Sequence, residues 1–328
     1  SSTNNTGTAN GSRVGGLVGQ SNGNISNASA SGTVTANGDS AGGLVGQSDG
    51  IVSNSEASGD VSVEGDEAGG LIGRSTGDVK NASASGNVTA NGSRAGGLVG
   101  QSDGNVTSSS ASGDVSAGED EAGGLIGQSD GAVDTSSASG NATTNGSRAG
   151  GLVGQANGTV SNSEASGDVS AGGNEAGGLL GQSNAAVNNA SASGTVSADG
   201  SRVGGLIGQS DGDVTSSTAN GTVNASGNEA GGLVGQSNAA VKNSSASGDV
   251  SANGNTVGGL LGESNGTVSS STASGDVAAT GPNTGALIGT QSSEKAITDS
   301  AASGDVQVDG NSTGDLVGGA GGSSTLPS

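Results

Sequence analysis

The sequence predicts an all-β protein, a parallel β-solenoid (β-helix) of about 11–12 coils of 27 residues with three short strands in each coil. The first observation behind this prediction is a leucine that returns every 27 residues without insertion or deletion. The last copy, Leu316, follows after 29 residues. A short fixed period over nearly the whole chain indicates one structural unit stacked on itself. The copies at 27-residue spacing are Leu17, Leu44, Leu71, Leu98, Leu125, Leu152, Leu179, Leu206, Leu233, Leu260 and Leu287.

The second and third observations come from within one repeat, residues 15–41. Glycines divide it into three segments of strand length, 17–22, 24–31 and 33–37. Residues 28–36 alternate, with Ala28, Ala30, Val34 and Ala36 on one side and Ser or Thr on the other. Period-two alternation is typical of a half-buried strand, and apolar helical spacing is missing from all three segments. Each strand is therefore expected to pair in parallel with its equivalent one repeat away.

Composition alone favours a disordered chain. The chain is 29% hydrophobic, has 70 glycines and carries a formal net charge of −22. Such values are typical of disordered chains. The strict 27-residue register favours a folded stack instead, because disordered chains tolerate changes of length. The sequence has no aromatic residue, so the interior is expected to be narrow and built from Leu, Val, Ala and Gly.

The charge is strongly acidic, with 30 Asp and Glu against 8 Lys and Arg. An acidic surface repels nucleic acid and anionic membranes. It also keeps a protein soluble when salt screens charge, which is typical of salt-adapted proteins. An ordinary acidic secreted surface is the alternative. Because no apolar run approaches the roughly 20 residues that cross a bilayer, we expect no membrane insertion in this chain.

The position four residues before each leucine forms a column, and from Glu67 to Glu229 its charge changes sign at every repeat. In a stack with about 4.8 Å between coils, each arginine would lie between glutamates. Opposed charges stabilise such a column, and a slip by one coil would bring like charges together. We call this column the charge ladder; its members are Glu67, Arg94, Glu121, Arg148, Glu175, Arg202 and Glu229.

Two further columns are polar. The first alternates acid and amide through Asp60, Asn87, Asp114, Asn141 and Asp168, but it ends with three adjacent acids, Asp249, Asp276 and Asp305. The alternation avoids neighbouring carboxylates. At the three adjacent acids, either a bound cation or screening by high salt would have to reduce the repulsion. The second is a row of glutamines that includes Gln20, Gln47, Gln101 and Gln128. Stacked amides add hydrogen bonds along a solenoid, and a ligand-binding surface is the alternative.

The repeated phrase resembles the GLUG motif. Examples are Gly42-Gly43-Leu44-Val45-Gly46, followed by Val52-Ser53-Asn54 and Ala57-Ser58-Gly59-Asp60-Val61. The resemblance covers essentially residues 10–320. It implies a β-solenoid and a secreted or cell-surface protein, because such repeats occur in adhesin-like and peptidase-associated stalks. Ser and Ala replace the family's usual aromatic and Cys positions, which weakens any transfer of a binding function.

We expect no enzyme, because His, Cys and Tyr are absent and the carboxylates form columns rather than a convergent pair. No cofactor is expected. Calcium is a weaker possibility at the acidic runs Glu64-Gly65-Asp66-Glu67 and Glu119-Asp120-Glu121, for which a solvated acidic corner is the alternative. Asn10, Asn91 and Asn145 precede Gly-Ser at expected turns and are candidate N-glycosylation sites in an exported protein.

These observations predict an N-terminal segment 1–12, a single solenoid 13–317 and a Gly/Ser-rich tail 318–328. The expected function is that of a rigid, extracellular structural rod at the cell surface that forms or decorates a filament. Self-association end to end would follow from exposed strand edges. The alternative is an adhesin stalk that recognises glycans or partner cells.

Overall fold

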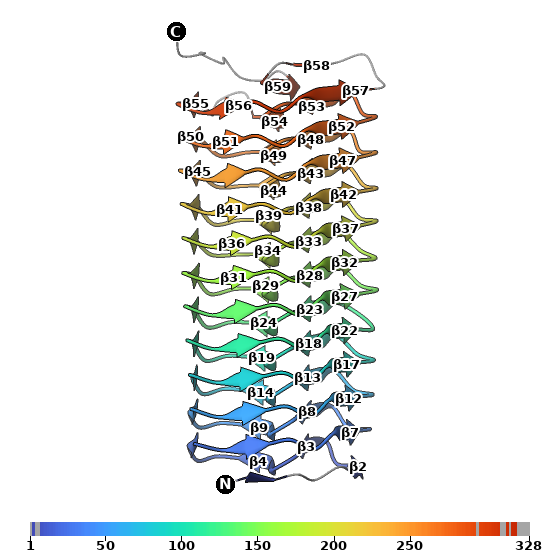
Figure 1. Cartoon of the computed structure of the whole chain (residues 1–328), viewed down its shortest axis with the longest axis vertical. Helices are drawn as coiled ribbons and strands as arrows, with labels where there is room; N and C mark the ends of the chain where they lie inside the picture. Colours follow the sequence, from blue (N-terminus) through green and yellow to red (C-terminus); the bar gives the residue numbers. More distant parts are fainter. Residues whose placement is uncertain (1, 4–6, 293–294, 309–312, 315, 320–328) are drawn as a thin grey trace. The chain divides into compact units, whose positions relative to one another are not determined.

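The computed structural model describes residues 2–3, 7–292, 295–308, 313–314 and 316–319. The chain divides into two compact units, Ser1–Gly167 and Asp168–Ser328. All regular secondary structure in the described residues is β-strand, and equivalent strands pair in parallel one repeat apart within each unit (Figure 1). The predicted all-β parallel solenoid is therefore confirmed. Most of the predicted tail, residues 320–328, lies outside the described residues.

Within the described residues, each complete coil contains five short strands, where the sequence predicted three. The segment 24–31 is broken at Asn27, which has a φ of 53°. This left-handed conformation turns the chain between two strands, and asparagine tolerates it better than most residues. A second break follows Gly15, which ends a separate strand before the leucine. Glycine positions alone did not reveal either corner.

In the first unit the strands form five parallel sheets, one on each side of the coil. The first sheet contains β1 (Ser2–Thr3), β6 (Ser29–Ala30), β11 (Glu56–Ala57), β16 (Ser83–Ala84), β21 (Ser110–Ala111), β26 (Ser137–Ala138) and β31 (Glu164–Ala165). The second contains β2 (Gly7–Ala9), β7 (Val34–Ala36), β12 (Val61–Val63), β17 (Val88–Ala90), β22 (Val115–Ala117) and β27 (Ala142–Thr144). The third contains β3 (Arg13–Gly15), β8 (Ser40–Gly42), β13 (Glu67–Gly69), β18 (Arg94–Gly96), β23 (Glu121–Gly123) and β28 (Arg148–Gly150). The fourth contains β4 (Val18–Ser21), β9 (Val45–Ser48), β14 (Ile72–Ser75), β19 (Val99–Ser102), β24 (Ile126–Ser129) and β29 (Val153–Ala156). The fifth contains β5 (Ile25–Ser26), β10 (Val52–Ser53), β15 (Val79–Lys80), β20 (Val106–Thr107), β25 (Val133–Asp134) and β30 (Val160–Ser161).

The second unit repeats this arrangement. Its corresponding sheets are, first, β36 (Ser191–Ala192), β41 (Thr218–Ala219), β46 (Ser245–Ala246), β51 (Thr272–Ala273) and β56 (Ala301–Ala302). The next is β32 (Val169–Ala171), β37 (Val196–Ala198), β42 (Val223–Ala225), β47 (Val250–Ala252), β52 (Val277–Ala279) and β57 (Val306–Val308). The third is β33 (Glu175–Gly177), β38 (Arg202–Gly204), β43 (Glu229–Gly231), β48 (Thr256–Gly258), β53 (Asn283–Gly285) and β58 (Thr313–Gly314). The fourth is β34 (Leu180–Ser183), β39 (Ile207–Ser210), β44 (Val234–Ser237), β49 (Leu261–Ser264), β54 (Ile288–Gln291) and β59 (Val317–Gly319). The fifth is β35 (Val187–Asn188), β40 (Val214–Thr215), β45 (Val241–Lys242), β50 (Val268–Ser269) and β55 (Ile297–Thr298).

Solenoid pairing starts before residue 13. Strand β1 pairs with β6 through Ser2 and Ser29, and β2 pairs with β7 through Thr8 and Thr35. Residues 2–3 and 7–9 therefore contribute strands to the same sheets as the coils that follow.

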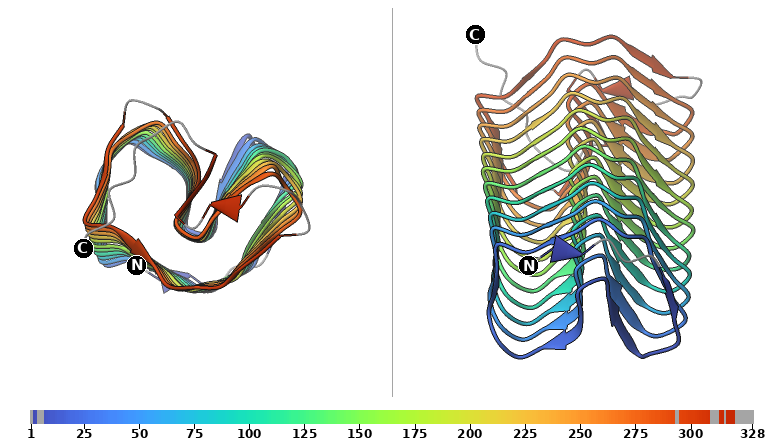
Figure 2. Two further views of the ribbon diagram at one scale, coloured as in Figure 1. Left: turned by 90° about the horizontal axis from the view of Figure 1, so that it is seen from above. Right: turned by 60° about the horizontal axis from the view of Figure 1, so that its bottom comes forward.

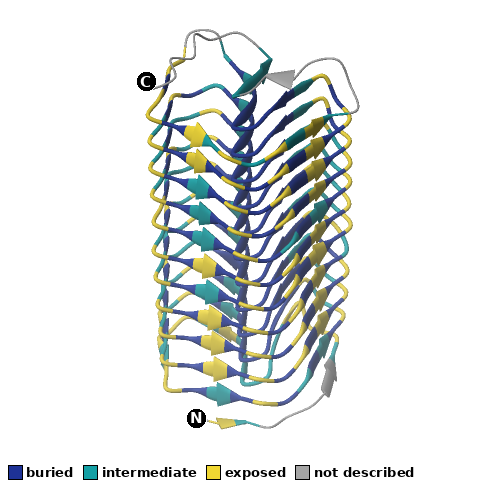
Figure 3. Cartoon of the chain, turned by 45° about the horizontal axis from the view of Figure 1, so that its top comes forward, coloured by how far each residue is buried: buried dark blue, intermediate teal, exposed yellow. Residues whose placement is uncertain are grey.

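The apolar side of each strand faces the inside of its coil. Ala28, Ala30, Val34 and Ala36 are buried as the alternation predicted, and Leu98 in the middle of the first unit is 0% exposed. Buried residues flank an exposed one in β12, β17 and β22 of the second sheet, whereas β23 and β24 of the third and fourth sheets have no exposed residue; Figure 3 is coloured by burial. Since Val, Leu, Ala and Gly fill this interior, the coil is thin and depends on close backbone packing.

The outline of the coils of the first unit (blue to green) is indented, as the view along the stack in Figure 2 shows. The repeated Gly-Gly-Leu-Val-Gly phrase permits strands of the third and fourth sheets to pack directly against each other. A Cβ on Gly96 in β18 would overlap the carbonyl oxygen of Val99 in β19. A Cβ on Gly100 would lie 3.0 Å from the backbone nitrogen of Ala68 in β13. Glycine is therefore required here by close backbone approach.

Candidate functional site

The charge ladder runs along the third sheet, at the first residue of each strand. In the first unit, Glu67 is the register partner of Arg94, Arg94 of Glu121, and Glu121 of Arg148. Arg94 lies 3.4 Å from Glu67, and Arg148 lies 2.9 Å from Glu121, measured between guanidinium nitrogen and carboxylate oxygen. In the second unit, Arg202 forms an ion pair with Glu175 and is also the register partner of Glu229. The ladder thus consists of charged groups held on adjacent coils.

The glutamates of this ladder are unusually buried for charged residues. Glu67 is 8% exposed and Glu121 is 7% exposed. Burial raises the pKa of Glu67 and of Glu121, while nearby arginines act in the opposite direction. Burial also raises the pKa of Glu229; the neighbouring Glu263 raises it further, and Arg202 opposes the shift. The arginines therefore only partly offset the cost of removing these carboxylates from water.

Reversing the charge of Arg148 is expected to destabilise the first unit more at low salt than at high salt. The Arg148→Glu variant would place a carboxylate beside the buried Glu121, lowering the free energy of unfolding by roughly 2 kcal/mol at low ionic strength. Salt screens like charges, so the loss should shrink in molar salt. Thermal melts at both salt concentrations measure this. Lys80→Glu, which makes the same two-unit charge change and removes only an exposed ion pair with Asp78, is the control and should lose less stability at low salt. Equal losses at low and high salt would contradict an electrostatic role.

Neutralising Glu121 is expected to change how stability depends on pH. A carboxyl group with a raised pKa in the folded state stabilises the fold below its unfolded pKa, and this contribution is lost as pH rises through the folded pKa. The Glu121→Gln variant should therefore lose less stability than the wild type between pH 4.5 and neutrality. Denaturant titrations at several pH values measure this slope. The exposed Glu56→Gln variant controls for the loss of one negative charge. A free energy of unfolding that falls more steeply with pH in Glu121→Gln than in the wild type would contradict the burial argument.

One basic residue beside the ladder was not assigned a role by the sequence. Arg74 occupies a position in the glutamine row, on β14, and its guanidinium lies 3.6 Å from Glu67 and 3.2 Å from Asp103. The glutamine row lies beside the ladder, since Arg94 donates to the side-chain oxygen of Gln128 at 3.1 Å. In the sequence, the charge ladder and the glutamine row are always seven residues apart, and this constant spacing was the available signal that they lie side by side.

The column of Asp and Asn residues accepts backbone hydrogen bonds from the next coil. The Asp60 carboxylate accepts from the backbone N–H of Asn87 at 2.8 Å, and the Asn87 amide oxygen accepts from that of Asp114 at 2.9 Å. Asp and Asn serve equally well in this role. In the second unit, Asp249 accepts from the backbone of Asp276 at 2.9 Å, and Asp276 accepts from that of Asp305 at 2.9 Å. These bonds give the three adjacent acids a structural role that charge alternation did not explain.

A buried serine column supports the left-handed corner. The Ser109 hydroxyl donates to the carbonyl of Thr107 at 2.9 Å and accepts from the backbone N–H of Ala82 at 3.2 Å. Ser136 repeats this pattern with Asp134 and with the backbone of Ser109. The column follows the residues with positive φ, so it satisfies backbone groups where the strands are interrupted. The sequence alone had assigned no role to these serines.

The predicted glycosylation sites and acidic runs do not come together into one site. Asn10, Asn91 and Asn145 are exposed, and their glycosylation stays a prediction. In the acidic runs, Glu67 and Glu121 point into the ladder and are buried, whereas Asp66 and Asp120 are exposed. Among the described residues, no group of three or more His, Cys, Asp or Glu side chains could hold a metal ion.

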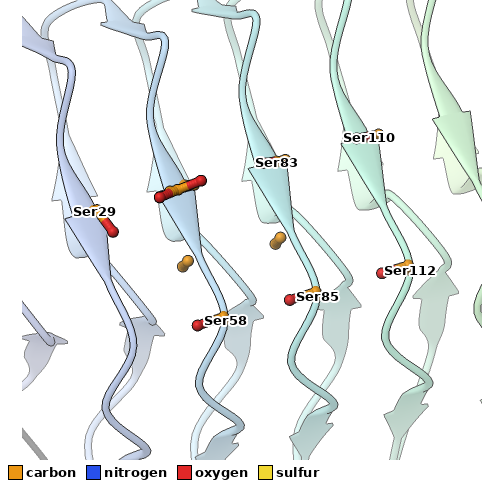
Figure 4. Close-up of a pocket in the computed structure, with 9 residues that line it drawn as sticks. Ser29, Ser58, Ser83, Ser85, Ser110 and Ser112 are labelled. Carbon is orange, nitrogen blue, oxygen red and sulfur yellow. The ribbon is translucent and has the colours of Figure 1, made fainter. Parts of the chain in front are cut away.

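A groove runs along the first sheet of the first unit, with a volume of about 270 Å³. We call it the hydroxyl groove. Figure 4 shows two rows of serines on successive coils, with Ser83 and Ser110 in one row and Ser85 and Ser112 in the other. The lining residues are Ser29, Glu56, Ala57, Ser58, Ser83, Ala84, Ser85, Ser110 and Ser112.

The described part of the chain has no helix of the length and apolar character needed to cross a membrane. No significant match was found among curated proteins or solved structures. A family model described as the GLUG motif matches six segments, residues 10–35, 66–89, 91–116, 145–170, 199–224 and 226–251. These matches fall on the same 27-residue coils that carry the Gly-Gly-Leu-Val-Gly turn. The chain therefore contains six segments that match the GLUG motif.

Proposed function

We propose that this chain is a non-enzymatic structural segment of an extracellular protein, whose stacked GLUG coils form or decorate a filament at the cell surface. The observation that carries the proposal is the unbroken register within each unit. Every side of the coil is joined to the next coil by backbone hydrogen bonds, such as Val61 to Asn87 at 2.8 Å and Leu71 to Leu98 at 2.9 Å. Such pairing gives a stack stiffness along its axis without disulfides, and the chain has no Cys.

The acidic surface supports a salt-rich setting. With a net charge of −22, the protein would stay soluble where salt screens the repulsion that keeps ordinary proteins from precipitating. The half-buried charge ladder is shielded from that salt more than surface pairs are. The combination suits a protein that works outside the cell.

Two experiments test the proposal. Antibodies against the protein should label intact cells of the source organism, whereas labelling only after permeabilisation would contradict the location. Negative-stain imaging and sedimentation of the whole protein from low to molar salt should show filaments, or particles arrayed on a fibre. Dispersed single particles throughout this range, and none on cell-surface fibres, would contradict the filament role.

The hydroxyl groove favours a second candidate, an adhesin stalk that binds glycans. Sugars present many hydroxyl groups, and the rows of serines offer donors and acceptors at the regular spacing of the coils. A glycan array probed with the wild type and with the Ser83→Leu/Ser85→Leu variant tests this candidate. Ser191→Leu/Ser193→Leu, at the equivalent positions of the second unit, is the matched control. Binding that survives the first double substitution, or an array without any bound glycan, would contradict it.

A further inference from the structure

Two columns in the first unit alternate with a period of two coils. In the third sheet the charge changes sign between Glu67, Arg94 and Glu121, and Arg148 follows. In the second column, acid alternates with amide from Asp60 to Asn87 and on to Asp114 and Asn141, as the chain of side-chain to backbone hydrogen bonds shows. The two columns are in phase, because Glu67 and Asp60 belong to one repeat and Arg94 and Asn87 to the next.

The rest of the coil scarcely distinguishes one repeat from the next. Leu71 donates its backbone N–H to Leu98 as Leu98 does to Leu125. Ala84 pairs with Ala111, and Val88 pairs with Val115. A strand that paired with the coil after its proper neighbour would keep the same apolar contacts. A chain of near-identical repeats therefore risks a slip of register during folding.

The charge ladder would make a one-coil slip costly. It would place Glu67 beside Glu121, two carboxylates that are 8% and 7% exposed. Adjacent parallel strands lie only about 4.8 Å apart. Two carboxylates at that spacing that are nearly removed from water repel strongly. A two-coil slip would instead place Glu67 beside Arg148 and Asp60 beside Asn141, which restores both patterns.

We propose that the charge ladder acts as a register lock, which rejects one-coil shifts and accepts two-coil shifts. The Asp/Asn column follows the same two-coil period but accommodates neighbouring acids, as Asp249 and Asp276 show. The functional repeat of the first unit is then a pair of coils, 54 residues, although the backbone repeats every 27. The stack can be shortened in steps of two coils without loss of its polar pairing. This inference is independent of the proposed location and filament role.

Deletions in the whole protein test the lock. Removing residues 82–108 takes out one coil and brings Glu67 next to Glu121 and Asp60 next to Asp114. Removing residues 82–135 takes out two coils and brings Glu67 next to Arg148 and Asp60 next to Asn141. Both deletions join Asn81 to a serine at the position equivalent to Ala82, so the backbone at the junction is the same. The matched control removes residues 28–54, a single coil, and brings Arg13 next to Glu67.

At low salt, the two-coil deletion should melt at a higher temperature than the one-coil deletion of residues 82–108, although it retains less of the stack. The control deletion should also melt above the deletion of 82–108. Molar salt should narrow both differences, because it screens the like charges. Glu67→Gln in the deletion of 82–108 should raise its melting temperature. A deletion of 82–108 that melts at or above the two-coil deletion at low salt, or a difference that salt leaves unchanged, would overturn the proposal.

Discussion

Replacing Gly96 with alanine is expected to lower the free energy of unfolding by about 3 kcal/mol or more. The added Cβ would overlap the carbonyl oxygen of Val99 and lie 2.7 Å from the backbone nitrogen of Gly127 and 2.8 Å from the Cα of Ile126. These are backbone atoms on two strands, so no side-chain rotation can relieve the overlap. Chemical denaturation followed by circular dichroism measures the loss.

The matched control is Gly23→Ala, in the same unit. A Cβ at Gly23 meets no atom within 4 Å, so this substitution should cost little. Equal losses for the two alanine variants would show that the third and fourth sheets do not pack backbone to backbone, and would contradict the account of the Gly-Gly-Leu-Val-Gly turn.

Truncating Leu98 to alanine is expected to cost about 2–5 kcal/mol. Leu98 is 0% exposed, and the leucines above and below it are among the largest fully buried side chains. A thin coil of Val, Ala and Gly has few groups that could move to fill the cavity, so the upper part of this range is expected. Denaturant melts of the purified protein give the value.

Ile51→Ala is the control for Leu98→Ala, because Ile51 is 38% exposed and removes a comparable volume from the surface. Its loss should be a small fraction of that at Leu98. A cost at Leu98 no greater than that at Ile51 would contradict the assignment of the leucine column to the core.

The sequence predicted the coil length, the parallel register and the buried face of residues 28–36, because all three follow from an invariant period and from alternation. It underestimated the number of strands. The corner at Asn27 depends on a left-handed backbone, and Ser108 and Thr135 adopt the same φ of 51° at equivalent positions. Since residues with no special preference also occupy this corner, local composition could not reveal it.

The candidate sites were predictable where they follow the period and unpredictable where they depend on side-chain direction. The position of Arg94 between Glu67 and Glu121 follows from the 27-residue spacing. The pairing of Arg74 with Glu67 and Asp103 needed the indentation of the coil, which brings the third and fourth sheets together. The hydrogen bonds of the Asp60 column likewise depend on where each carboxylate points, and sequence alone suggested only charge avoidance.

Thiol cross-linking between neighbouring coils tests the central claim, an in-register stack that advances one coil per 27 residues. The chain has no Cys, so introduced pairs react without background. Thr89 and Ser116 are register partners on β17 and β22 and are both exposed, so Thr89→Cys/Ser116→Cys should be joined efficiently by a short thiol cross-linker. Ser62→Cys/Ser116→Cys, two coils apart, should not be joined under the same conditions. Equal cross-linking of both pairs, or preference for the second pair, would contradict the stack.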